Sequence, residues 1–182
     1  MTEGGVLTAT ATPVIPFMSD PTSATFFKPD TDYPSLFGPP LRIQVDIEPT
    51  PSSIFTVTKT TNRAVYDAAR ARAGVPPLSS TIHPDPPLPS DVLLFNSQNM
   101  ITETSIYNVA FYRSKRWLTP LVSTGCLPGV LRRWLLEQGR IFEDDENLLT
   151  KESIVEGECV LLLNGVQGCQ LGRVTLSTHI SQ

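Results

Sequence analysis

The chain has 182 residues, of which 40% are hydrophobic, and this is enough to form one folded domain with a core. A formal net charge of −4 without a basic cluster argues against nucleic acid as the main partner. No apolar run approaches the ~18 residues that a membrane span needs, and three widely spaced cysteines predict neither a disulfide framework nor a metal site.

Proline divides the chain into two parts, because 15 of its 17 prolines lie at or before residue 89. Residues 1–40 show no helical or alternating period. We therefore predict an irregular, proline-rich arm over residues 1–40 and a folded domain over residues 41–182. The arm lacks the arginines of a mitochondrial presequence and the basic start and long apolar block of a secretory signal, so a cytoplasmic protein is expected.

The first part of the domain is predicted to hold two β-rich segments and a helix. Residues 41–47 alternate apolar and polar residues, as half-buried strands do, and residues 54–58 form a second β-rich run. A helix is predicted over residues 63–73, with Gly74 just beyond its end. The proline-rich stretch that follows is expected to be an exposed loop.

The second part is predicted to consist mostly of strands. Residues 92–95 indicate a buried strand that ends in a turn, where Asn99 is expected to have a positive φ. Residues 101–112 indicate a strand that turns back at residues 113–116, and a helix is predicted over residues 130–138. The remaining expected elements are a solvated acidic loop at 143–146, a short helix at 151–156, and strands at 158–164 and 171–177. The predicted fold class is α+β, strand-rich with two main helices.

Three features of the sequence are candidates for chemistry. Lys59 ends an uncharged β-rich run, where it is either a solvated charge or a partly desolvated amine with a lowered pKa that can form a Schiff base. Glu103 lies in the uncharged, β-prone run 100–106, where a carboxylate either faces solvent or needs a partner. At Gly129 a ligand could approach the backbone, and the free N–H groups of the helix that follows suit an anion.

In order and spacing, these features resemble the class IV aminotransferases, the fold-type IV pyridoxal 5′-phosphate (PLP) enzymes. The motif Lys-Thr-Thr-x-Arg-x-x-Tyr-Asp-x-Ala-Arg from Lys59, with Asn164-Gly165, is most similar to fungal 4-amino-4-deoxychorismate lyase-like proteins. The resemblance covers residues 41–176 and implies the C-terminal, PLP-binding domain of the D-amino acid aminotransferase-like fold. The matching segments are 59–63, 96–109, 119–120 and 125–132.

The resemblance also implies roles for particular residues. Lys59 would hold PLP as a Schiff base and act as the general acid–base, and Glu103 would keep the pyridine nitrogen of the cofactor protonated. Arg63 and Tyr66 match the motif too, but surface charge and helix packing are the simpler interpretation for them. Backbone N–H groups at the start of the second main helix would bind the cofactor phosphate. The implied cofactor-binding residues are Lys59, Glu103, Gly129, Val130, Leu131, Asn164 and Gly165.

The chain departs from the resembled family before residue 41. Those enzymes have an N-terminal α/β domain that supplies an arginine to the phosphate, closes over the substrate and forms part of the dimer. A proline-rich segment of 40 residues is too short to form such a domain, and the first arginine is Arg42. We therefore expect that domain to be missing and the cofactor face to be open on one side.

Three functions follow from these features. The favoured one is a PLP-dependent lyase of folate biosynthesis, which converts 4-amino-4-deoxychorismate to 4-aminobenzoate and pyruvate through Lys59. The alternatives are a branched-chain or D-amino acid type aminotransferase on the same site, and a truncated, non-catalytic member that binds the cofactor or another protein. The expected partners are a small-molecule amino substrate and either a second copy of the chain or another protein that covers the open cleft, with no nucleic acid, membrane or metal.

Overall fold

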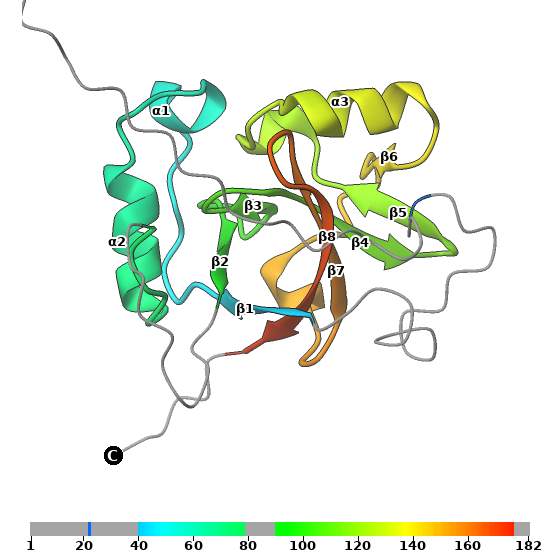
Figure 1. Ribbon diagram of the computed structural model, residues 1–182. Coiled ribbons are helices and arrows are strands. Elements are labelled where there is room, and N and C mark those ends of the chain that lie inside the picture. Colours follow the sequence, from blue (N-terminus) through cyan, green and yellow to red (C-terminus); the bar gives the residue numbers. More distant parts are fainter. Residues whose placement is uncertain (1–21, 23–39, 79–89, 177–182) are drawn as a thin grey trace, which may run out of the picture.

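A computed structural model describes residue 22 and residues 40–78 and 90–176 of the chain (Figure 1). The eight strands within these described residues form one sheet, in the order β3-β2-β1-β8-β7-β4-β5-β6. The elements in chain order are β1 (Leu41–Val45), α1 (Ile54–Val57), α2 (Ala64–Arg72), β2 (Asp91–Phe95), β3 (Ile101–Thr104), β4 (Asn108–Arg113), β5 (Arg116–Thr119), the 3-10 helix η1 (Val122–Thr124), α3 (Val130–Glu137), β6 (Phe142–Glu143), the 3-10 helix η2 (Lys151–Ser153), β7 (Cys159–Asn164) and β8 (Gly168–Thr175).

The sheet curls into an open barrel. β1 is parallel to both of its neighbours, β2 and β8, whereas β2 and β3, β7 and β8, and β4 and β7 pair antiparallel. β3 and β4 are far apart in the strand order, yet only residues 105–107 connect them, and the Thr104 N–H donates to the Tyr107 carbonyl oxygen at 2.8 Å. The strands between them must therefore curve until β3 and β4 meet.

Alternate residues of the strands divide the apolar side chains between two sides of the sheet. In β7, for example, Val160 and Leu162 point into the barrel, whereas Leu161 and Leu163 point outward. The barrel core contains Ile43, Val45, Leu93, Phe95, Ile101, Tyr107, Val109, Phe111, Leu118, Leu149, Ile154, Val160, Leu162 and Val174.

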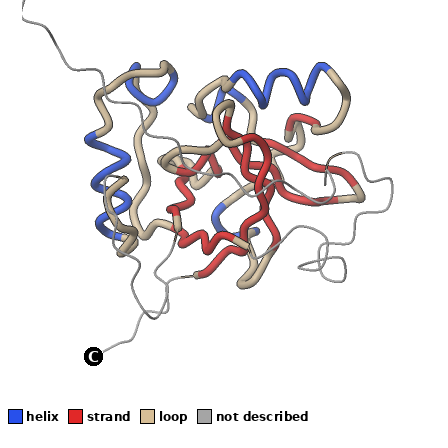
Figure 2. Tube along the Cα trace, in the orientation of Figure 1, coloured by secondary structure: helices blue, strands red, loops and turns tan. Residues whose placement is uncertain are grey.

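Helices cover the outer face of the sheet in two separate places. Figure 2 shows these helices outside the strands. α2 packs Tyr66 and Ala69 against Val92 and Leu94 of β2. α3 packs Leu135 into a cluster with outward-facing residues of β4 and β7. Figure 1 places α1 and α2 on one side of the strands and α3 on another. None of the helices within the described residues has the length and apolar character to cross a membrane.

The two main helices lie where the sequence predicts them. α2 is followed by Gly74 with φ 66° and α3 by Gly139 with φ 63°, and Asn99 has the expected positive φ of 60°. The predicted loop after α2 and the predicted arm fall mostly outside the described residues, as does residue 177 of the expected last strand. The division of the chain at residue 40 stays a prediction.

The predicted β-rich run at residues 54–58 is wrong, because the structure has helix α1 there. Ser53 caps this helix: its Oγ accepts the N–H of Phe55 at 3.2 Å, and its own N–H donates to Oγ1 of Thr56 at 2.9 Å. This reciprocal capping box fixes a helical turn although the residues favour strands. Lys59 therefore follows a helix, not a strand.

Two further expectations need correction. The segment 101–112 is not one strand, since residues 105–107 cross from β3 to β4. The acidic run expected to be a solvated loop is partly buried: Asp144 is 2% exposed and accepts the N–H groups of Leu148 and Leu149 at 2.9 and 2.8 Å. A carboxylate that satisfies backbone donors in this way holds the turn against the sheet.

Candidate active site

A cavity of about 790 Å³ lies between the segment from α1 to α2 and the start of α3. Its size is within the range of roughly 300–1,000 Å³ that is usual for small-molecule sites. Of the seven cofactor-binding residues implied by the sequence, Leu131 is absent from the lining, and six line the cavity together: Lys59, Glu103, Gly129, Val130, Asn164 and Gly165.

A β-bulge in β3 places Glu103 in this site. Two residues of β3, Thr102 and Glu103, stand opposite a single residue of β2, Leu94. Bulges re-aim side chains and are frequent next to active sites. The side chain of Glu103 is only 5% exposed, so of the two interpretations that the sequence left open, the buried and partnered carboxylate is the one observed.

Three donors hold the Glu103 carboxylate. The Tyr66 hydroxyl donates to Oε1 at 2.7 Å, and the Leu127 N–H and the Asn108 Nδ2 donate to Oε2 at 3.1 and 3.4 Å. Burial raises the pKa of Glu103 from 4.5 to about 7, although the bonds from Tyr66 and Leu127 act in the opposite direction. This carboxyl group is therefore set to ionise when a cation comes close to it.

Tyr66 and Arg63 both line the cavity. Helix packing is observed for Tyr66, which contacts β2, but the same side chain also donates to Glu103. Burial raises the pKa of Tyr66 and the neighbouring Glu103 carboxylate raises it further, so the hydroxyl keeps its proton and remains a donor. Arg63 lines the cavity and donates from a terminal nitrogen to the Ser105 carbonyl oxygen at 2.8 Å. Its Nε is buried and forms no hydrogen bond within the described residues.

Arg70 of α2 supports this arrangement through contacts with Asp91 and Ser105. Its guanidinium donates to Asp91 Oδ1 at 3.0 Å and to Ser105 Oγ at 2.8 Å. The ion pair is buried, since the side chain of Arg70 is 7% exposed and that of Asp91 is 1% exposed. Arg70 is the last residue of the motif that begins at Lys59, but the sequence suggested no role for it. The spacing of Arg63, Tyr66 and Arg70 at i, i+3 and i+7, which puts all three on one face of a helix, was a signal for such a role.

Gly129 lines the cavity and also has a packing role that the sequence did not indicate. A Cβ atom at this position would lie 2.1 Å from Oδ1 of Asn108, so glycine allows the start of α3 to approach the side chain of Asn108 on β4. Asn108 in turn donates to the Leu127 carbonyl oxygen at 2.7 Å. The close approach therefore serves the protein's own framework, which fixes the position of the α3 N-terminus relative to Glu103.

The first turn of α3 carries free backbone donors. Gly129 is its N-cap residue and makes no side-chain cap, so the N–H groups that follow, including those of Val130 and Leu131, have no capping side chain. Val130 is 71% exposed on the cavity wall, whereas Leu131 packs toward the cluster beneath α3. Leu131 can therefore take the expected part in binding the cofactor phosphate only through its backbone N–H.

Lys59 and the β7–β8 turn complete the lining. Lys59 is exposed in the segment between α1 and α2, so of the two interpretations that the sequence left open, the solvated charge is the one observed. Asn164 donates to the Ile106 carbonyl oxygen and accepts the N–H of Val166, both at 2.8 Å, which ties the turn at Gly165 to the link between β3 and β4. Within the described residues there is no cluster of His, Cys, Asp and Glu that could hold a metal ion.

The sequence matches the family model of amino-transferase class IV over residues 5–171. The chain belongs to this family. Among its curated relatives, aminodeoxychorismate lyase of Saccharomyces cerevisiae is 38% identical over 141 residues, which are 72% of this chain and 36% of that protein. A Schizosaccharomyces pombe protein provisionally named aminodeoxychorismate lyase is 43% identical over 108 residues, 59% of this chain and 43% of that one.

A solved structure gives the fold of this class IV member independently. The 4-amino-4-deoxychorismate lyase of Pseudomonas aeruginosa superimposes with a TM-score of 0.55 at 18% identity, over 77% of this chain and 48% of that one. The predicted strand-rich α+β fold of fold-type IV is thereby confirmed. The chain spans less than half the length of the curated relatives that it matches.

Proposed function

We propose that this chain binds pyridoxal 5′-phosphate and acts as a lyase on 4-amino-4-deoxychorismate, releasing pyruvate and 4-aminobenzoate. The observation that carries the proposal is Glu103, a buried carboxyl group that lines one cavity together with Lys59 and the start of α3. The lyase is preferred because both fungal relatives carry that name. A homodimer and a cytosolic location stay predictions.

The residues present fit the cofactor at three points. Its ring nitrogen needs a carboxylate that ionises beside a cation, which Glu103 offers with a pKa raised to about 7. Its aldehyde needs an amine, and Lys59 lines the same cavity and would hold the group as a Schiff base. Its phosphate needs N–H donors, which the uncapped first turn of α3 provides at Val130 and Leu131.

The chain's own residues would then carry out the proton chemistry. When bound, the cofactor supplies an electron sink for the negative charge that develops on the substrate carbon. The Lys59 Nζ, once released, would take the proton from that carbon and return a proton later as a general acid. Glu103, oriented by Tyr66 and by the Leu127 N–H, would keep the ring nitrogen protonated. The remaining donors of Arg63 would bind an anionic oxygen of the ligand.

Covalent trapping tests cofactor binding separately from the reaction. Borohydride reduction of the protein with PLP should fix the cofactor on the peptide that contains Lys59, as read by mass spectrometry. Lys59→Ala should lose this adduct, whereas Lys115→Ala, which removes an exposed lysine at a hairpin, should keep it. A wild-type protein without the adduct would overturn the proposed cofactor.

Pyruvate release from 4-amino-4-deoxychorismate then tests the reaction. We expect release without any added keto acid, and Glu103→Gln should keep the adduct but slow release on the order of 100-fold, because a neutral amide does not hold the ring nitrogen protonated. Amino transfer to a keto acid without pyruvate release would indicate an aminotransferase. An adduct with neither activity would indicate a non-catalytic cofactor-binding protein.

A further inference from the structure

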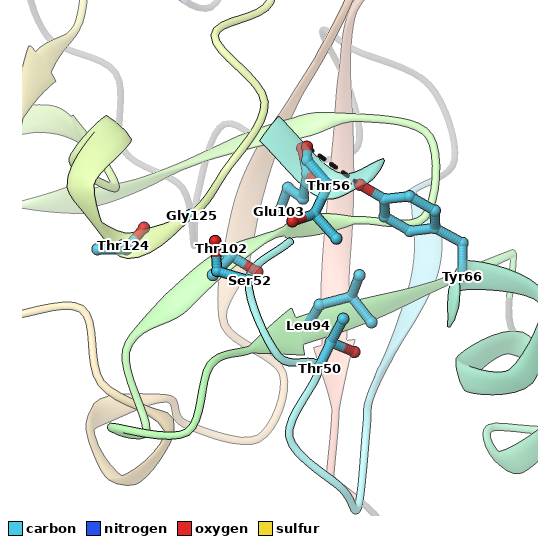
Figure 3. Close-up of a pocket in the computed structure, with 9 residues that line it drawn as sticks. All are labelled: Thr50, Ser52, Thr56, Tyr66, Leu94, Thr102, Glu103, Thr124 and Gly125. Carbon is cyan, nitrogen blue, oxygen red and sulfur yellow. Dashed lines mark hydrogen bonds between the residues drawn. The ribbon is translucent and has the colours of Figure 1, made fainter. Parts of the chain in front are cut away.

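Glu103 and Tyr66 also line a second, much smaller cavity (Figure 3). Its volume is about 10 Å³, which is close to the space that one water molecule needs. Besides Tyr66, five hydroxyl side chains surround it. The remaining lining residues are Thr50, Ser52, Thr56, Leu94, Thr102, Thr124 and Gly125.

Two local devices build this cavity. The bulge in β3 places Thr102 and Glu103 together opposite Leu94, so both residues line the same small cavity. Gly125 closes it on another side with φ 100°, and a Cβ atom there would lie 2.6 Å from Oγ of Ser52. A side chain at position 125 would therefore be strained and would displace Ser52.

Three of the hydroxyl groups, those of Thr50, Ser52 and Thr102, form no hydrogen bond with side chains or backbone within the described residues. Thr50 and Thr102 are each only 7% exposed. Buried hydroxyls are normally paired, with protein groups or with an ordered water molecule, and water needs two to four polar partners to occupy a cavity. This cavity offers such partners.

We infer that the small cavity is a binding site for one ordered water molecule, which hydrogen-bonds to the hydroxyls around it and stabilises the ionised form of Glu103. Ser52 is exposed, so the site lies next to bulk solvent. Glu103 is then hydrated from this side even when a ligand fills the large cavity. The site does not depend on the proposed reaction, because it is built from the protein alone.

Four charged or titratable groups lie around Glu103, and most of them are outside the small cavity. Arg63 and Tyr66 face it from α2, Asp91 from the start of β2, and Cys126 from the segment before α3. Arg63 favours the ionised carboxylate and Asp91 opposes it. Of these four only Tyr66 lines the small cavity, so a change of the threonine hydroxyl there leaves the charges in place.

The test compares Thr102→Val, which keeps the shape but removes the hydroxyl, with Thr102→Ser, which keeps the hydroxyl. Crystal structures of the cofactor-free proteins should show the water in wild type and in Thr102→Ser, and not in Thr102→Val. The ¹³C NMR titration of the Glu103 carboxyl should move upward by about 0.5–1 pH unit in Thr102→Val, because the ionised form loses hydrogen bonding, and should stay near wild type in Thr102→Ser.

Ser52→Ala provides a second variant at the exposed side of the cavity, where a folding defect is not expected, and its titration should shift in the same direction. A wild-type crystal structure without the water would overturn the site. A water that is present in wild type while Thr102→Val and Ser52→Ala titrate like wild type would overturn its effect on Glu103.

Discussion

Replacing Glu103 by glutamine should stabilise the cofactor-free protein, and it should do so only toward neutral and alkaline pH. The wild-type carboxyl group is buried at 5% exposure and must ionise there as the pH rises, whereas an amide does not ionise. The amide also fits the existing donors, since its oxygen can accept the Leu127 N–H while its NH₂ group donates to the Tyr66 oxygen, which lies 2.7 Å from the carboxylate.

The magnitude follows from the shift in pKa. Burial raises the pKa of Glu103 from 4.5 to about 7 in the folded protein, so between these values unfolding releases a proton. The contribution of Glu103 to the free energy of unfolding is therefore most favourable below pH 4.5 and falls as the pH rises. Above pH ~7 the loss is complete and amounts to about 3 kcal/mol, at 1.36 kcal/mol per pKa unit. From pH 5 to pH 8, the advantage of Glu103→Gln should grow by about 2–3 kcal/mol.

Urea unfolding at several pH values, followed by the fluorescence of the buried Trp117, would measure this advantage. Glu137→Gln is a matched control because Glu137 is exposed on α3, and it should give no such growth. A stability difference between Glu103→Gln and wild type that is the same at pH 5 and pH 8 would refute the reasoning, since the carboxyl group would then not titrate in the buried state described here.

Three other substitutions test the framework of the site. Arg70→Met should lower the free energy of unfolding by about 3–5 kcal/mol, measured in urea, because the buried Asp91 carboxylate loses the guanidinium 3.0 Å away; a loss below about 1 kcal/mol would contradict this. Gly129→Ala should abolish PLP binding in calorimetry while the chain still unfolds cooperatively, because the new Cβ would collide with Asn108. Ser53→Ala should cost about 1 kcal/mol of thermal stability through loss of the α1 cap, and an unchanged melting temperature would argue against the capping box.

The sequence predicts those elements whose ends carry local signals. α2 and α3 each show a helical period and stop before a glycine with positive φ, so both were placed to within about two residues. α1 carries no such period, and a single reciprocal cap at Ser53 decides its conformation. The break between β3 and β4 is also invisible in the sequence, because it depends on how far the whole sheet curls.

The site was predictable to the extent that its motif is contiguous. Lys59 and Glu103 stand out from uncharged surroundings, but the roles of Tyr66 and Arg63 depend on partners 37 and 42 residues away along the chain. The spacing within α2 indicates a shared face and does not say what that face contacts. The bulge that turns Thr102 and Glu103 toward one side results from pairing with β2, which no local pattern reveals.

The parallel pairing of β1 with β8 has a consequence for how the chain folds. Residues 41–44 pair with residues 172–175, so the first described strand finds one of its two neighbours only after residue 175 has been synthesised. Contacts of such sequence separation slow folding, to the range of ms to s in strand-rich domains. Until then both β1 and β7 present an open edge that can pair with other chains. Because β8 lies between β1 and β7, removing it would divide the sheet in its middle and would leave the Asn164–Ile106 hydrogen bond as one of the contacts that still join the two halves.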